Sequence, residues 1–133
     1  MSELTLEAKL ENLDRVLAFV DKFLEDLDCS PKPQMQIDIA VEELFVNIAK
    51  YAYTPAIGSM TLRIEKDPIG VAITFIDRGV PYNPLAKLDP DVTLSAEERQ
   101  IGGLGIFMVK KSMDNMEYKH EAGQNILTIR KKI

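Results

Sequence analysis

The stretch that decides the fold is the segment Ile39-Ala40-Val41-Glu42-Glu43-Leu44-Phe45-Val46-Asn47. Its apolar residues continue the helical spacing of Ile37 and Ile48, and this spacing predicts one buried stripe on an amphipathic helix. Glu43 and Asn47 are four residues apart at one flank of the stripe, so they are neighbours on the same helix face. Such a carboxylate and carboxamide can reach a cleft while the helix stays anchored, although an ordinary solvated Glu–Asn pair would have the same spacing.

Outward from this helix, strand patterns alternate with helix patterns. We expect Asn12 to be the N-cap of a first helix, and Asp38 to lie on the solvent-facing flank of the second. The expected elements are a strand over 4–10, helices over 12–27 and 34–53, strands over 60–66 and 71–77, a helix from about 106, and a closing hairpin over 116–122 and 126–132. This order predicts an α+β fold, a two-layer α/β sandwich with a mixed, mainly antiparallel sheet.

Composition narrows the class of protein further. The chain has 133 residues, which suits a single domain over 1–133, and it carries 21 acidic against 16 basic side chains. An acidic chain without a basic block is a poor direct binder of nucleic acid. It has no apolar run long enough to span a membrane, and a single Cys29 and a single His120 provide neither a disulfide nor a Cys/His metal cluster. We therefore expect a soluble, cytoplasmic protein.

A second candidate motif is Asp77-Arg78-Gly79-Val80-Pro81, which follows a mostly apolar strand. An Asp at a strand end lies where the sheet meets a loop, and its carboxylate could accept a hydrogen bond from an exocyclic amine such as that of adenine. Gly79 permits backbone conformations that are closed to other residues. A simple polar turn is the alternative interpretation.

A third candidate motif is Gly102-Gly103-Leu104-Gly105, which begins a helix after a long polar segment. Glycines let backbone approach phosphate oxygens, and the free N–H groups of a helix N-terminus favour anions. The motif is neither a Walker A loop nor a GxGxxG that follows a strand. A helix start after a flexible loop would explain it almost equally well.

Taken in order, the three motifs resemble the ATP-binding domain of the GHKL superfamily, which is shared by histidine kinases, gyrase, Hsp90 and MutL. Within it, the chain is most similar to the short anti-sigma-factor serine kinases of the RsbW and SpoIIAB type. The resemblance is carried by residues 39–47, 75–84 and 97–106 and covers nearly the whole chain. It implies the histidine-kinase-like (Bergerat) ATPase fold, with an ATP lid at about 82–103.

The resemblance also implies roles for individual residues. Asn47 would hold the Mg²⁺ that bridges the ATP phosphates, and Glu43 would be the catalytic general base. Asp77 would bind the adenine amino group, and Gly79 would let the loop pack against the base. The glycine box, Gly102, Gly103, Leu104 and Gly105, would cover the phosphates. Arg99 would neutralise phosphate or hold a protein partner, unless it is an ordinary residue of the lid surface.

By the same resemblance, the expected activity is transfer of the ATP γ-phosphate to a serine of a small STAS-type anti-sigma antagonist, together with sequestration of a sigma factor by a homodimer. Two alternatives keep the fold without this activity: a non-catalytic, ATP-dependent partner-switch module, and a degenerate domain that no longer binds nucleotide. A detached piece of a histidine kinase would need a phospho-accepting His on a preceding helical hairpin, which the sequence does not show.

The sequence departs from the family pattern at three places. Ala49-Lys50-Tyr51 stands where a His is common, Pro81 replaces a frequent glycine, and Phe107 replaces a frequent polar residue. None of these removes an expected ligand of the nucleotide, so the departures bear on the surface that meets partners.

Overall fold

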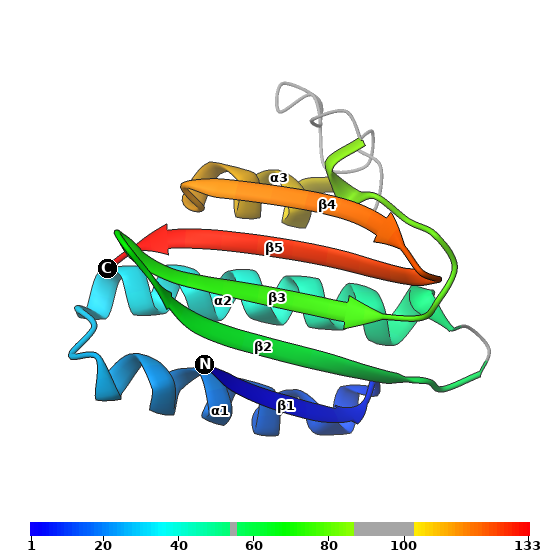
Figure 1. Ribbon diagram of the computed structural model, residues 1–133, viewed down its shortest axis with the longest axis horizontal. Coiled ribbons are helices and arrows are strands. Elements are labelled where there is room, and N and C mark those ends of the chain that lie inside the picture. Colours follow the sequence, from blue (N-terminus) through cyan, green and yellow to red (C-terminus); the bar gives the residue numbers. More distant parts are fainter. Residues whose placement is uncertain (54–55, 87–102) are drawn as a thin grey trace.

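The computed structural model describes residues 1–53, 56–86 and 103–133. It has one layer of strands and one layer of helices, with all three α-helices on the same face of the sheet (Figure 1). The elements are β1 (Ser2–Glu7), α1 (Leu13–Asp26), α2 (Pro31–Asn47), β2 (Ser59–Asp67), β3 (Gly70–Asp77), α3 (Gly103–Ser112), β4 (Asn115–Glu121) and β5 (Gln124–Lys132). The α+β two-layer sandwich predicted from the sequence is confirmed.

The described strands form one sheet in the order β1-β2-β3-β5-β4. Every neighbouring pair is antiparallel, which is more uniform than the mixed sheet that we expected. The reason is that each strand or α-helix of the described chain returns in the direction opposite to the one before it. Two hairpins, β2–β3 and β4–β5, supply half of these pairings.

The core lies between the sheet and the helices. Alternate residues of β2, Met60, Leu62 and Ile64, are buried against the helix layer. Helix α1 contributes Val16, Val20 and Leu24 from one stripe, and α2 contributes a second set: Ile37, Ala40, Val41, Leu44 and Phe45. The apolar stripe expected on α2 is thus confirmed, and its burial holds the neighbouring Glu43 and Asn47 in place.

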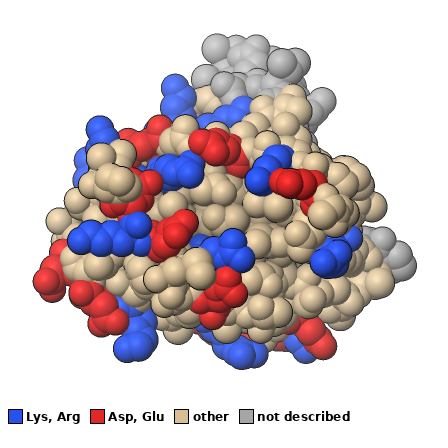
Figure 2. All heavy atoms as spheres, viewed as in Figure 1, with Lys and Arg blue, Asp and Glu red and all other residues tan. Residues whose placement is uncertain are grey.

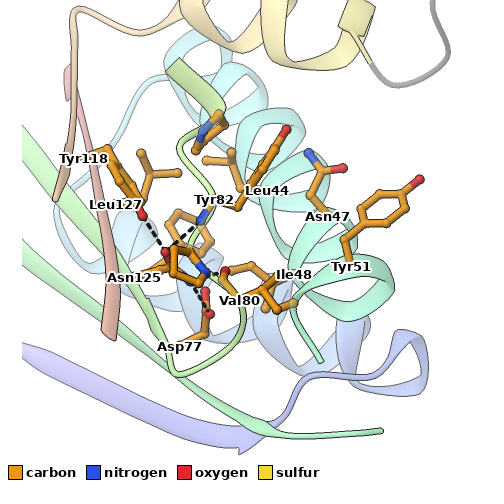
Figure 3. A pocket seen from close by; sticks show the side chains of 14 residues that line it. Leu44, Asn47, Ile48, Tyr51, Asp77, Val80, Tyr82, Tyr118, Asn125 and Leu127 are labelled. Atoms are coloured by element: carbon orange, nitrogen blue, oxygen red, sulfur yellow. Dashed lines mark hydrogen bonds between the residues drawn. The ribbon is translucent and has the colours of Figure 1, made fainter. Parts of the chain in front are cut away.

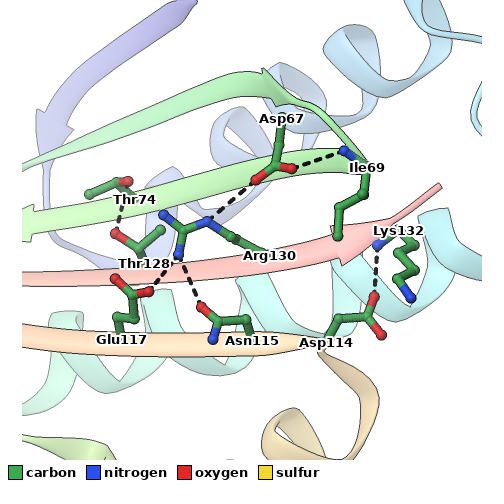
Figure 4. A network of polar contacts seen from close by, with 9 residues as sticks. All are labelled: Asp67, Ile69, Thr74, Asp114, Asn115, Glu117, Thr128, Arg130 and Lys132. Atoms are coloured by element: carbon green, nitrogen blue, oxygen red, sulfur yellow. Dashed lines mark hydrogen bonds and ion pairs between the residues drawn. The ribbon is translucent and has the colours of Figure 1, made fainter.

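The other face of the sheet is polar. Figure 2 shows acidic and basic side chains interspersed over this face, without a patch of one sign. Arg130 of β5 lies at the centre of one such group, because its guanidinium contacts Asp67 (Nε to Oδ2, 3.4 Å), Glu117 (Nη1 to Oε1, 3.1 Å) and Asn115 (Nη1 to Oδ1, 3.0 Å) from both flanking hairpins (Figure 4). Ion pairs at a protein surface typically contribute little to stability, so this group is a minor part of what holds the sheet together.

Two expectations about the helix ends were wrong. We expected α2 to begin near Gln34 after a proline break, yet it begins at Pro31. A proline at the first helical position loses nothing, because its missing N–H would have no partner within the helix. Asn12 precedes α1, but its side chain makes no capping bond there; it donates instead to the Glu7 carbonyl (2.8 Å) and so ties the helix start to β1.

The end of α2 also differs from a regular helix. From Ile48 to Ala52 the backbone continues as one π-helical turn, a wider coil that is often found at functional sites. The expected end at residue 53 is therefore confirmed, with a change of helix type in its last turn. This turn widens the helix where it meets the loop that follows β3.

Candidate functional site

A pocket lies between the end of α2, the loop after β3 and the β4–β5 hairpin (Figure 3). Its cavity volume is about 140 Å³, and its mouth opens to solvent. Its walls are mostly apolar, with a few polar groups that converge on it. The lining residues are Leu44, Asn47, Ile48, Tyr51, Ala52, Phe75, Asp77, Val80, Pro81, Tyr82, Pro84, Tyr118, Asn125 and Leu127.

Asp77 is the buried carboxylate of this pocket. It ends β3 on the helix-facing side of the sheet and is only 6% exposed. Its Oδ1 accepts hydrogen bonds from the backbone N–H of Gly79 (2.9 Å) and from Nδ2 of Asn125 (3.0 Å). A buried carboxylate with an oxygen that makes neither of these bonds has an acceptor to offer to a ligand.

Gly79 is required by a contact with α2. A Cβ at this position would lie 2.3 Å from the carbonyl oxygen of Ala52, in the π-helical turn. The next residue, Val80, donates its N–H to the same carbonyl (3.0 Å). The glycine thus lets the loop after β3 close onto α2 and form one wall of the pocket.

Tyr53 also holds the loop after β3 against the end of α2. Its hydroxyl accepts the backbone N–H of Arg78 (2.7 Å) and donates to the carbonyl of Ser59 (2.7 Å). One side chain therefore joins the end of α2, the start of β2 and the loop after Asp77. Nothing in the local sequence pattern marks Tyr53 for this role.

The structure separates the two polar residues of α2. Asn47 lines the pocket beside Tyr51, across from Asp77 and Asn125 (Figure 3), whereas Glu43 is not among the described lining residues. Glu43 lies one turn away, against the start of α3. A Cβ built on Gly105 would lie 2.0 Å from Oε1 of Glu43 and 2.2 Å from its Cδ. The expected motifs at 43 and 105 are thus in direct contact.

The glycine box is described only in part. Gly103 begins α3, and Leu104 and Gly105 belong to its first turn. Gly102, Arg99 and most of the expected lid over 82–103 lie outside the described residues. The part that is described confirms the expected helix start, which places free backbone N–H groups near Glu43.

Our sequence analysis missed Asn125 and Tyr118. Asn125 is 6% exposed and lies opposite Asp77 in the register of β3 and β5. Its Oδ1 accepts the Tyr118 hydroxyl (2.5 Å) and the backbone N–H of Tyr82 (3.1 Å). An Asn at the first positions of a strand, just after a Gly-Gln turn, was the available signal, but only the strand register connects it to Asp77.

Two titratable groups outside the pocket have shifted pKa values. Burial, with a hydrogen bond and charge repulsion from Asp21 and further repulsion from Glu25, raises the pKa of Asp38 to about 7. Asp38 is half-buried against α1, so our expectation of a solvent-facing residue was wrong. Burial, helped by Asp38, also raises the pKa of the Cys29 thiol, which disfavours the reactive thiolate. His120 is exposed.

The chemistry of the described residues limits what else the site could hold. Within residues 1–53, 56–86 and 103–133, no three His, Cys, Asp or Glu side chains come together as a metal site. The described helices include none with the length and apolar character that a bilayer crossing requires. The pocket is the main candidate, with the Asp77 carboxylate on one side and the Asn47 amide across from it.

Comparison with known proteins identifies the family. The model of the histidine kinase-like ATPase domain matches residues 6–131. The chain belongs to this family. The resemblance that we drew from the three motifs is thereby confirmed, and the pocket is lined by residues of two of the stretches that carried it, 39–47 and 75–84.

Relatives of this ATPase domain include named protein kinases. The chain is 28% identical over 103 residues to the serine/threonine-protein kinase BtrW of Bordetella bronchiseptica, covering 75% of this chain and 71% of BtrW. It is 28% identical over 93 residues to the serine-protein kinase RsbW of Bacillus mycoides, covering 67% of this chain and 58% of that kinase. The chain thus spans less than two thirds of the length of RsbW.

Two solved structures share the fold. The RsbU and RsbW domains of Rv1364c from Mycobacterium tuberculosis superpose with a TM-score of 0.66 at 16% identity, covering 99% of this chain and 33% of that one. A chain of the SiaB-SiaC complex from Pseudomonas aeruginosa superposes with a TM-score of 0.61 at 15% identity, covering 98% and 89%. At these identities the likeness concerns the fold.

Proposed function

We propose that this ATPase domain binds Mg-ATP in the pocket and transfers the γ-phosphate to a serine hydroxyl of a partner protein. The observation that carries the proposal is the arrangement of three groups. Asp77 is buried at one end of a mostly apolar pocket, Asn47 lies across from it, and Glu43 lies one helical turn beyond, at the start of α3. These groups suit the base, the phosphates and the transferred group of one nucleotide, in that order.

The adenine would bind at the Asp77 end. Oδ1 of Asp77 already accepts two hydrogen bonds, so Oδ2 would accept the exocyclic amino group of the base. Apolar walls from α2, Phe75 and Leu127 would bury its faces. A charged acceptor for an amino group makes a stronger hydrogen bond than a neutral one, and it disfavours a base with a carbonyl at that position.

The phosphates would lie toward Asn47 and the start of α3. The amide oxygen of Asn47 is a hard ligand suited to Mg²⁺, which is usually bound through one or two protein oxygens together with the phosphates and water. One amide oxygen at the pocket wall fits that pattern. Mg²⁺ supplies charge neutralisation on the phosphates. The glycine box, Gly102, Gly103, Leu104 and Gly105, would offer backbone N–H groups, and Arg99 would add a positive charge.

Glu43 would act as the general base. In the transfer step the serine hydroxyl gives its proton to the Glu43 carboxylate while its oxygen forms a bond to the γ-phosphorus. The bond from that phosphorus to the bridging oxygen breaks, and ADP keeps the electron pair. Phosphoryl transfer needs little covalent help from a protein, so positioning and charge neutralisation dominate, and the base adds about 10²–10⁴-fold.

The names of two relatives support the class of partner that we propose. BtrW is named a serine/threonine-protein kinase and RsbW a serine-protein kinase, which supports a serine as the acceptor. In keeping with the resemblance drawn from the sequence, we infer that this serine belongs to a small STAS-type anti-sigma antagonist and that the chain also holds a sigma factor in the cytoplasm. A partner-switch module that binds ATP without transferring phosphate is the alternative, and the structural likeness to a chain of the SiaB-SiaC complex is compatible with it.

The test is phosphate transfer from labelled ATP to a purified STAS-domain acceptor, with phosphoserine detected by mass spectrometry. We expect wild-type transfer, and a loss of about 10²-fold or more in Glu43→Ala with ATP affinity retained. Glu42→Ala is the matched control, because Glu42 is the exposed neighbour on the same helix. ATP binding without any transfer by the wild type would favour the partner-switch module, and full activity of Glu43→Ala would refute the role of the base.

A further inference from the structure

We propose that Asn125 is a positioning residue that orients the Asp77 carboxylate and thereby makes the pocket selective for a purine with a 6-amino group. This inference rests on the proposed function, since it concerns the adenine end of the same site. Asn125 is the second residue of β5, lines the pocket and is only 6% exposed. Asp77 faces it directly across the pairing of β3 with β5.

The orientation of the Asn125 amide is determined by two backbone groups. The N–H of Tyr82, which can only donate, points at Oδ1 (3.1 Å). The carbonyl of Val80, which can only accept, receives a hydrogen bond from Nδ2 (2.9 Å). Exchanging the two ends of the amide would break both bonds, and the Tyr118 hydroxyl gives Oδ1 a second donor. The NH₂ group is therefore held toward Asp77.

The consequence for Asp77 is that its two oxygens become unequal. Oδ1 receives Nδ2 of Asn125 (3.0 Å; Figure 3) and also the backbone N–H of Gly79 (2.9 Å). A carboxylate held this way cannot rotate without losing two charge-assisted bonds. Oδ2 is left as the acceptor for a ligand amine.

Asparagine is well suited to this position among the common side chains. An ionised Asp has nearly the same shape but offers no donor to the Asp77 carboxylate. Ala and Ser are too short to reach both the loop and Asp77, and Gln would push the amide further out by one methylene. Asn125 also joins the strand to the loop after β3 through Val80 and Tyr82, which both line the pocket. The same amide thus orients the Asp77 carboxylate and holds the loop after β3, which forms one wall of the pocket.

The test compares two nucleotides that differ only at the purine 6-position. ATP carries the amino group, and purine riboside triphosphate has hydrogen in its place. We expect wild-type protein to prefer ATP by about tenfold or more, because a hydrogen bond to a charged group is lost with the analogue. In Asn125→Ala this preference should fall to about threefold or less, measured as the ratio of dissociation constants by calorimetry.

A second variant tests the pH dependence of this preference, which would not change if Asn125 had only a structural role. Asn125→Asp keeps the shape of the side chain but places a second carboxyl group beside Asp77. At low pH the two carboxyl groups share a proton, whereas at high pH both are ionised and repel each other. When protonated, the new carboxyl can again donate to Oδ1. The preference for ATP should therefore recover as the pH is lowered from 8 to 5.5 in this variant. It should stay low throughout in Asn125→Ala.

The control and the outcomes separate this inference from the proposed function. Thr128→Val lies on the same strand but on the opposite face of the sheet, where Thr128 pairs with Thr74 (3.2 Å), so it should keep the wild-type ratio. A wild-type protein that binds no ATP, or binds both nucleotides equally, would refute the adenine site itself. A wild-type preference that persists in Asn125→Ala would overturn the positioning role. If Asn125→Ala does not fold, a pH-independent ratio in Asn125→Asp would overturn it equally.

Discussion

Replacing Gly105 by Ala should damage phosphate transfer while sparing both the fold and ATP binding. The added Cβ would lie 2.0 Å from Oε1, 2.2 Å from Cδ and 2.6 Å from Oε2 of Glu43. To reach the 3.4 Å at which ordinary contacts begin, the nearest carboxylate oxygen must retreat by about 1.4 Å. The end of a flexible Glu side chain can make this movement at a rotamer cost of about 1 kcal/mol.

The expected effect on the transfer rate is large, whereas the expected effect on stability is small. Misplacing a catalytic group by about 1 Å can cost about 10²-fold, so we expect a transfer rate lower by that factor. Ala is favoured over Gly inside a helix by about 0.5–1 kcal/mol, which offsets the strain of the shifted side chain. Thermal unfolding should therefore change by only a few degrees, and the dissociation constant of ATP should stay within about threefold.

The assay is single-turnover transfer from labelled ATP, with calorimetry for ATP binding. Met108→Ala is the control on the same helix, because Met108 is exposed. In a Glu43→Gln background the Gly105→Ala change should have no further effect, since the two changes act on one group. A Gly105→Ala protein that transfers at the wild-type rate, or an equal loss in both backgrounds, would refute the reasoning.

Three further predictions concern the Mg²⁺ site, the half-buried Asp38 and the oligomeric state. Asn47→Ala should remove the Mg²⁺-dependent part of ATP affinity, so calorimetry with and without chelator should give the same dissociation constant; a remaining difference would contradict the role of Asn47. The pKa of Asp38 is raised from 3.8 to about 7, so the folded protein holds this proton more tightly than the unfolded chain, and stability is lost as the pH rises across that window. The free energy of unfolding of Asp38→Asn should exceed that of the wild type by about 1 kcal/mol at pH 8, after discounting for solvent screening, and should equal it near pH 4. Urea unfolding at both pH values measures this difference. A difference that does not depend on pH would refute the prediction. A homodimer should give a light-scattering mass of twice 15.0 kDa, and a mass near 15.0 kDa would exclude it.

The local pattern of apolar and polar residues was sufficient to predict most of the helices and strands. The period-two alternation of β2 and the helical spacing of α2 reflect which side of each element is buried, and burial of one side is what the fold requires. The element ends were less predictable. Pro31 reads as a helix breaker in isolation, and only its place at the first helical position makes it compatible with α2.

The sequence by itself determined the element order, the fold class and the three motifs that point to an ATP site, because these depend on residues close together in the chain. The tertiary structure alone decided which of their groups meet. Asp77 and Asn125 are 48 residues apart and come together only through the register of β3 with β5. Glu43 and Gly105 meet only because α2 and α3 pack on the same face of the sheet. Such contacts depend on how whole elements pack, and packing is set by the sum of many buried side chains rather than by any local spacing.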